Sequence, residues 1–241
     1  TTLYGALSEM NSPEVKIITV EDPVEYALPR VTQVQVRESI GLDFARVLRT
    51  SLRQDPDIVM VGEIRDAETA EIAMRAAITG HRVLSTLHTN DAISTANRLL
   101  DMGIEPFMLA AALRGIVAQR LLRRVCAQCA ETRPASEEEI AWLSRAGHRD
   151  PDSVMVSEGK GCQVCDYTGY SGRVGLFELV EIDKDMREAL RKIDFAAFAE
   201  HAQASPTFTP MALSAIDFIE AGKTNVNEVI RLLGEIVGQE D

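Results

Sequence analysis

The sequence has no run of about 18 apolar residues, the length that a membrane-spanning helix needs. Its most apolar stretch, residues 108–125, is interrupted by Arg114, Gln119 and three further arginines. No charged segment followed by an apolar stretch opens the chain, so we find no signal peptide. An excess of positive charge is also missing, because 37 acidic residues against 25 Lys and Arg give a net charge of -12. Broad, non-specific binding to nucleic acids or anionic lipids needs the opposite balance and is not expected.

A phosphate-binding loop of the form Gly-x-x-x-x-Gly-Lys-Ser/Thr is absent as well. Residues 222–224 supply only its last three letters, and Asp217 stands where its first glycine should be, so we interpret them as a turn in which Thr224 caps the last helix. A phosphate-binding loop is normally followed directly by a helix. In this sequence a helical pattern begins at the first residue. We therefore expect the sequence to be a fragment with its phosphate loop upstream, and Thr1 and Thr2 to be the remnant of that loop.

The first half of the chain alternates between strand and helix patterns. Short apolar runs bounded by turn residues predict strands at residues 15–20, 58–61 and 82–87. Helical spacing of apolar residues predicts helices at residues 3–10, 44–52 and 67–78, and Asp91 is expected to cap a further helix. This alternation predicts an α/β domain over residues 1–115, a mostly parallel sheet with helices on both faces.

Helical patterns dominate from about residue 116, and we expect a second, mainly helical subdomain over residues 116–241. A hairpin-like stretch is expected at residues 172–180. The helices predicted in this half are residues 116–125, 136–146, 184–192, 195–204, 211–221 and 226–234.

Three carboxylates follow the first predicted strand, at Glu21, Asp22 and Glu25. Open parallel sheets bind ligands at the carboxyl ends of their strands. A carboxylate at that edge can orient a water molecule or help to hold Mg²⁺ near a terminal phosphate. A solvated acidic turn is the competing interpretation, and Glu25 by itself is expected to be a surface residue.

The other two strands also end in polar residues. Gly62 and Glu63 follow the second strand, where P-loop NTPases place an acidic residue that polarises the attacking water. The third strand ends in a polar run, residues 85–91, that contains His88, and an imidazole there can hydrogen-bond a phosphate oxygen. Purely structural roles for both residues remain open, and His81, at the start of the third strand, is expected to be structural.

Four cysteines form two Cys-x-x-Cys pairs, separated by residues 130–161. Two such pairs can give four thiolates to one tetrahedral Zn²⁺, and four sulfur ligands leave no open position, so the metal would be structural. Free thiols, disulfides or an iron–sulfur cluster are the alternatives. The module is expected over about residues 126–180, with Cys126, Cys129, Cys162 and Cys165 as ligands.

Together these segments resemble the secretion ATPase superfamily, which serves type II secretion and type IV pilus assembly. Residues 19–26 resemble its aspartate box, residues 52–66 its Walker B region and residues 80–91 its histidine box. The cysteine module and residues 169–175 resemble the assembly and secretion branch, whereas the retraction ATPases of the superfamily lack that module.

The resemblance implies a RecA-like core in a cytoplasmic homohexamer, attached through an inner-membrane platform protein, that uses ATP, Mg²⁺ and Zn²⁺. It implies that Glu63 is the main catalytic carboxylate, that Glu21 positions water or metal, and that His88 contacts the γ-phosphate. Without its phosphate loop the fragment is expected to bind ATP poorly. Asp22, Arg46 and Arg53 are expected to line the nucleotide site.

Two other functions fit parts of the sequence. The cysteine pairs, with a basic patch at Arg120, Arg123 and Arg124, suit a zinc-dependent nucleic-acid-binding protein with a degenerate RecA fold. The net charge and the lack of aromatic residues between these arginines oppose it. A catalytically dead fragment or scaffold is the third possibility, if the natural protein starts at Thr1.

Overall fold

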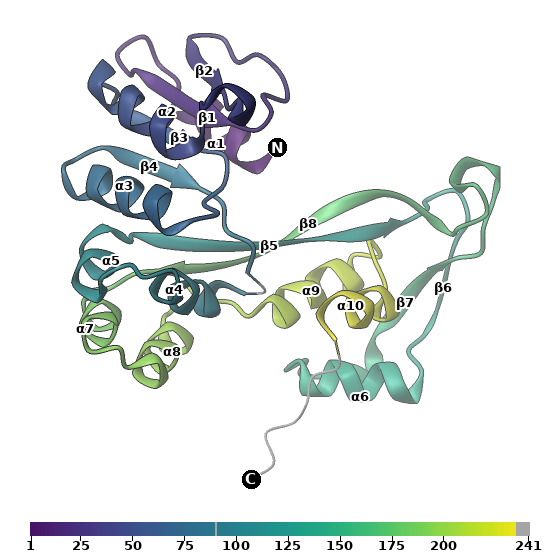
Figure 1. The fold of residues 1–241 in the computed structure, drawn as a ribbon. Coiled ribbons are helices and arrows are strands. Elements are labelled where there is room, and N and C mark those ends of the chain that lie inside the picture. Colours follow the sequence, from purple (N-terminus) through teal and green to yellow (C-terminus); the bar gives the residue numbers. More distant parts are fainter. Residues whose placement is uncertain (90, 235–241) are drawn as a thin grey trace. The chain divides into compact units, whose positions relative to one another are not determined.

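The computed structural model describes residues 1–89 and 91–234, which form two compact units (Figure 1). The first unit contains Thr1–Ile116 and Glu181–Ala202, and the second contains Val117–Val180 and the chain from Gln203 onward. Residues 181–202 therefore belong with the first unit, although the sequence placed all of residues 116–241 in the second. Within the described residues, no helix combines the length and the apolar composition needed to cross a membrane.

A four-stranded parallel sheet organises the first unit, in the order β2-β1-β3-β4. In register, Thr19 pairs with Met60, and Met60 pairs with Leu84. Every residue of β1 and β3 is buried, as expected for central strands of a sheet that is covered on both faces. The strands are β1 (Ile17–Glu21), β2 (Val31–Gln35), β3 (Ile58–Val61) and β4 (Arg82–Ser85).

Helices cover both faces of this sheet, as predicted. Tyr4 and Leu7 of α1 pack with Ile17, Ile58 and Met60 on one face, and α2 contacts β1, whose alternate side chains point to the other face. Aspartate side chains cap α2, α3 and α4 by accepting from the backbone N–H three residues on. The helices are α1 (Thr2–Met10), α2 (Phe44–Ser51), α3 (Ala67–Ile78), α4 (Ala92–Asp101), α5 (Pro106–Ala112), α7 (Lys184–Lys192) and α8 (Phe195–Ala204), with 3₁₀ turns at Glu38–Ile40 and Leu52–Gln54.

The second unit contains strands that the sequence did not predict. Residues 116–125 are not a helix but most of strand β5, and residues 172–180 are not a hairpin but part of the single strand β8 that pairs with β5. The partner of each strand lies far away in sequence, so local periodicity cannot reveal the pairing. The elements are β5 (Gly115–Val125), β6 (Ala130–Pro134), α6 (Glu137–Arg145), β7 (Met155–Gly159), β8 (Tyr170–Glu181), α9 (Met211–Glu220) and α10 (Val226–Leu233), with 3₁₀ turns at Pro151–Ser153 and Gln163–Cys165.

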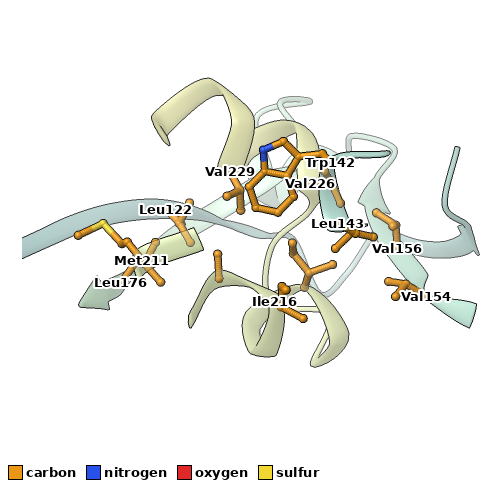
Figure 2. Close-up of a cluster of buried hydrophobic side chains, with 12 residues drawn as sticks. Leu122, Trp142, Leu143, Val154, Val156, Leu176, Met211, Ile216, Val226 and Val229 are labelled. Atoms are coloured by element: carbon orange, nitrogen blue, oxygen red, sulfur yellow. The ribbon is translucent and has the colours of Figure 1, made fainter. Parts of the chain in front are cut away.

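Figure 2 shows the apolar core of the second unit, which gathers side chains from all of its helices. Trp142 of α6, the single tryptophan of the chain, is 1% exposed. Leu122 of β5 and Leu176 of β8 reach the same core, together with Val229 of α10. The core therefore ties the long strands to the C-terminal helices, and Trp142 is a natural fluorescent reporter of its integrity.

A buried carboxylate fastens α10 to β5. Asn225, and not Thr224 as the sequence suggested, caps α10, because the Thr224 hydroxyl donates instead to the Arg123 carbonyl at 3.0 Å. The Glu228 side chain has no exposed surface and accepts hydrogen bonds from both Arg123 and Arg231 at 2.6–2.9 Å. Burial raises the pKa of Glu228, but the bonds from the two arginines outweigh it and lower the pKa to about 2.

We expect Glu228→Gln to destabilise the second unit by about 3 kcal/mol at neutral pH, since it leaves two arginines without their shared carboxylate. In the wild type, the stability contributed by the Glu228 carboxylate is fully present above about pH 4.3, the pKa of a glutamate in the unfolded chain. This stability is lost as the pH falls toward 2, the pKa of Glu228 in the folded protein. Urea unfolding followed by Trp142 fluorescence at several pH values measures both effects. Glu138→Gln, at an exposed position of α6, is the control and should change little. Equal pH dependence of wild type and Glu228→Gln would contradict the role of this carboxylate.

Candidate active site and metal centre

The polar ends of three neighbouring strands meet at the carboxyl edge of the parallel sheet. Glu21 ends β1, Glu63 follows β3 and His88 follows β4. His88 Nε2 lies 3.2 Å from Glu63 Oε2. The loops that carry them are joined, because the Thr86 hydroxyl donates to the Gly62 carbonyl at 2.7 Å. The structure thus brings Glu63 and His88 into contact, while Asn90 of the same polar run lies outside the described residues.

Glu63 is held as a partly accessible carboxylate. A hydrogen bond from Arg65 lowers the pKa of Glu63 below its usual range. Burial raises this pKa by less, and the hydrogen bond with His88 lowers it further. Its side chain remains 18% exposed, so one edge faces solvent. Arg65 also pairs with Asp22 at 3.5 Å, and its guanidinium lies over the Phe44 ring, 5.8 Å from its centre. Arg65 therefore links the acidic loop after β1 to the glutamate after β3.

Gly62 permits a close approach where β3 turns into this loop. Its N–H donates to the Val20 carbonyl at 2.7 Å, and a Cβ at this position would lie 3.2 Å from that same oxygen. The small residue therefore lets the loop carrying Glu63 approach β1 closely.

Glu21 is buried, with 3% of its surface exposed, on the side of the sheet that α1 covers. It accepts hydrogen bonds from the hydroxyls of Tyr4 and Thr19, and from Gln33 Nε2 at 3.1 Å. Burial, and next the bond to Glu21, raise the pKa of the Tyr4 phenol, so it stays a proton donor at neutral pH. Three neutral donors thus fix the Glu21 carboxylate at the end of β1, at the same edge of the sheet as Glu63 and His88.

The first turn of α1 lies at the same edge, since Tyr4 of that turn reaches Glu21. Thr1 is the N-cap residue and Thr2 begins the helix. The free N–H groups and the dipole at a helix N-terminus favour anions, including phosphate. The structure therefore places Thr1 and Thr2 with the predicted site.

The two predicted arginines lie toward opposite ends of α2. Phe44, at the start of the helix, is next to Gly62. Arg46 comes two residues after Phe44 and donates to the Gly41 carbonyl at 3.1 Å. Arg53 comes after the helix has run about 12 Å and just before β3 starts, at the amino edge of the sheet. The structure does not bring Arg53 to the site, because α2 runs antiparallel to the strands. His81 bonds to the end of α3 and is structural, as expected.

The four cysteine sulfurs of the second unit form one compact group, all within 4.8 Å of one another. Cys126 and Cys162 are 3.9 Å apart, Cys129 and Cys165 3.9 Å, and Cys162 and Cys165 3.8 Å. A tetrahedral Zn²⁺ with four sulfurs at about 2.3 Å requires separations close to 3.8 Å. Disulfides need sulfurs about 2.05 Å apart, and all four residues are free cysteines.

Backbone N–H groups donate to two of the four sulfurs. Gly161 N–H donates to the Cys129 sulfur at 3.3 Å, and Cys162 N–H donates to the Cys165 sulfur at 3.2 Å. Burial raises the pKa of Cys165, but backbone donors from Cys162 and Gly169 outweigh it and lower the pKa to about 6. Burial raises the pKa of Cys129 to about 11, so one thiol of the group loses its proton far more readily than the other. The donor set and its geometry therefore fit a zinc ion.

The family model described as "Type II/IV secretion system protein" matches residues 1–231. This chain belongs to the type II/IV secretion system protein family. Type II secretion system protein E of Aeromonas hydrophila is 48% identical over 235 residues, which cover 98% of this chain and 46% of that protein. The type IV pilus assembly ATPase PilB of Myxococcus xanthus is 46% identical over 235 residues, covering 95% and 41%. The chain spans less than half the length of these curated relatives.

Solved structures of a pilus retraction motor and of an ATPase share the fold. The pilus retraction motor PilT with bound ADP superimposes with a TM-score of 0.69 at 28% identity, over 96% of this chain and 57% of PilT. The ATPase DotB of Legionella pneumophila gives a TM-score of 0.65 at 22% identity, over 95% of this chain and 56% of its own, and supports the fold alone. The family resemblance inferred from the three boxes is thereby confirmed.

Sequence reasoning missed Tyr4, Gln33 and Arg65 in this family member. Arg65 lies within residues 52–66, the segment that resembles the Walker B region. Its position two residues after Glu63 was the available signal. Tyr4 and Gln33 carry no local signal, because each reaches Glu21 only after the chain has folded.

We expect Tyr4→Phe to destabilise the first unit by about 2 kcal/mol, because a buried carboxylate loses one of its donors. Urea unfolding followed by far-ultraviolet circular dichroism measures the loss. Tyr26→Phe is the control, since the Tyr26 ring packs on the Tyr4 ring at 4.6 Å and the side chain is largely exposed. Equal losses for both variants would show that the bond to Glu21 is not what matters.

Proposed function

We propose that this chain is the motor part of a hexameric ATPase that powers the assembly of a type II secretion pseudopilus or a type IV pilus. The observation that carries the proposal is the contact between Glu63 and His88 at the carboxyl edge of a parallel sheet, beside the first turn of α1. The names of the relatives, a type II secretion protein and a pilus assembly ATPase, support it. In this proposal the motor works in the cytoplasm and acts on an inner-membrane platform protein.

The residues of this edge suit hydrolysis of a terminal phosphate. The phosphate would lie between the N-terminus of α1, with Thr1 and Thr2, and the Glu63–His88 pair. Glu63 is ionised and has an edge open to solvent, so its carboxylate can orient a water molecule and accept its proton. His88 can donate a hydrogen bond to a phosphate oxygen, so binding there competes with its contact to Glu63.

The remaining groups of the edge support this arrangement. Glu21, fixed by three donors, can hold a water ligand of Mg²⁺ without moving, and Mg²⁺ would neutralise charge on the phosphates. Arg65 and Asp22 position Glu63 from the side, and Arg46 lies one helical turn into α2.

We expect Glu63→Gln, tested in the whole protein, to lower the turnover of ATP by at least about 100-fold while ATP binding persists. Steady-state hydrolysis and nucleotide-binding titrations measure the two quantities separately. Glu71→Gln on α3 is the matched control, because its carboxylate pairs with Arg75 on the helix surface, and it should hydrolyse ATP normally. Normal turnover by Glu63→Gln would remove this glutamate from the mechanism.

The nucleic-acid-binding alternative gains no support from the basic patch. Arg123 is already engaged, because its guanidinium binds Glu228 and lies 4.2 Å from the centre of the Tyr170 ring. Arg123 therefore has a structural role in joining β5, β8 and α10.

We further propose that Cys126, Cys129, Cys162 and Cys165 hold one structural Zn²⁺. Elemental analysis should find about one zinc per chain, and Cys129→Ser should abolish it. The same variant should lower the unfolding midpoint followed by Trp142 fluorescence, whereas Ser171→Ala, a neighbouring control, should keep both metal and midpoint. Metal-free wild-type protein with an unchanged midpoint would contradict a structural metal.

A further inference from the structure

A basic stripe lies on the first unit, away from the sheet edge. Figure 1 shows α7 beside α5, and the two helices are in contact. A shallow hollow of about 290 Å³ opens between them, floored by the alanines at the C-terminal end of α5. Its cationic lining residues, which we call the basic stripe, are Arg114, Lys184, Arg187 and Arg191.

Two residues of the basic stripe have a structural role. Arg114 donates to the Ala111 carbonyl at 2.8 Å and to the Leu113 carbonyl at 3.3 Å, so it satisfies the C-terminal end of α5. Arg191 stands in the last turn of α7, where a cation is favourable, and pairs with Glu188 at 3.4 Å.

The other two residues of the stripe have no such role. Within residues 1–89 and 91–234, the structure gives neither Lys184 nor Arg187 an ion pair. Both stand in the first half of α7, where cations oppose the helix dipole, and Arg187 also faces like charges three residues before and four residues after it. The Asp183 carboxylate is occupied in capping the Met186 N–H. Asp185 and Glu188 stand on the same helix, and Glu188 pairs with Arg191 and Lys192. In a chain with 37 acidic residues against 25 basic ones, these two cations still form no ion pair within the described residues.

We propose that the basic stripe docks an acidic peptide segment of another protein, through carboxylates spaced along that segment. Three of its cations recur along α7 at positions 184, 187 and 191, over about 10 Å, which suits several anionic groups in a row. All but the half-buried Arg187 are exposed, so the hollow is a surface on which a segment lies and not a cavity that encloses a small anion. Guanidinium groups bind carboxylates in pairs of parallel hydrogen bonds, which favours this partner.

The stripe also has the electrostatics of a docking surface. The chain is acidic overall, so an acidic partner is repelled by most of its surface and attracted here, which selects one binding position. This inference is independent of ATP hydrolysis, because none of the four residues belongs to the Glu63–His88 site.

Fluorescence anisotropy of a labelled peptide of alternating glutamate and glycine tests the proposal on the whole chain. We expect Lys184→Gln and Arg187→Gln each to weaken its affinity at least fivefold at low ionic strength. Lys192→Gln is the matched control, because Lys192 lies on the same helix outside the hollow and pairs with Glu188, and it should change the affinity less than twofold. Circular dichroism of each variant checks that the chain as a whole remains folded.

Competition experiments separate the peptide from other anions. Inorganic pyrophosphate, a short single-stranded oligonucleotide and vesicles containing anionic lipid should each displace the peptide only weakly at equal charge concentration. Stronger binding of any of these at the stripe would overturn the peptide assignment, as would equal losses for Lys184→Gln and Lys192→Gln. Absence of peptide binding to the wild type would overturn it as well.

Discussion

Parallel pairing of β1, β3 and β4 is the constraint on which the first unit depends. Parallel strands end at the same edge, so residues separated by many positions in the chain arrive there together. Glu63 and His88, 25 residues apart in sequence, meet for this reason alone. Helix α1 runs in the direction opposite to the strands, so its N-terminus lies at the edge where the strands end. The N-terminus of α1, the carboxylates of Glu21 and Glu63 and the imidazole of His88 are thereby gathered at one edge, with Glu63 and His88 on the short loops that follow β3 and β4.

The chain buries carboxylates in three different ways, and the differences correspond to what each can do. Glu228 is enclosed by two arginines, which makes it a permanent anion and a structural anchor. Glu21 is enclosed by hydroxyls and an amide, which orient it without neutralising its charge. Glu63 has a cation on one side and solvent on the other, so it is ionised and still reachable by water. Only this third environment suits a group that must exchange a proton during turnover.

Most of the first unit was predictable because its signals are local. Fully buried parallel strands appear as short apolar runs between turn residues, and β3 at Ile58–Val61 was obtained in this way to the residue. The residues just past those runs then followed from the rule that ligands bind at the carboxyl edge. Partners such as Tyr4 and Gln33, and the return of residues 181–202 to the first unit, depend on tertiary contacts that no local pattern records. Strand β5 was mistaken for a helix because Val117, Leu121 and Val125 recur every four residues, as on one face of a helix, and its partner β8 is distant in sequence.

The second unit shows why a metal would be useful at its cysteine end. Strands β6 and β7 form a sheet of only two strands, and most residues of β6 are exposed, so this part has little apolar burial of its own. The core around Trp142 stabilises α6, α9 and α10, whereas the loops that carry the cysteines meet mainly through backbone contacts. Gly159 and Gly169 approach so closely there that a side chain on Gly159 would overlap the backbone of Gly169. Four thiolates on one ion would supply the cohesion that apolar packing does not, since metal binding free energy becomes folding free energy where a site is not otherwise preformed. Coordination would then fix this end of β5 and β8, and the bond between Arg123 and Glu228 fixes the chain nearby.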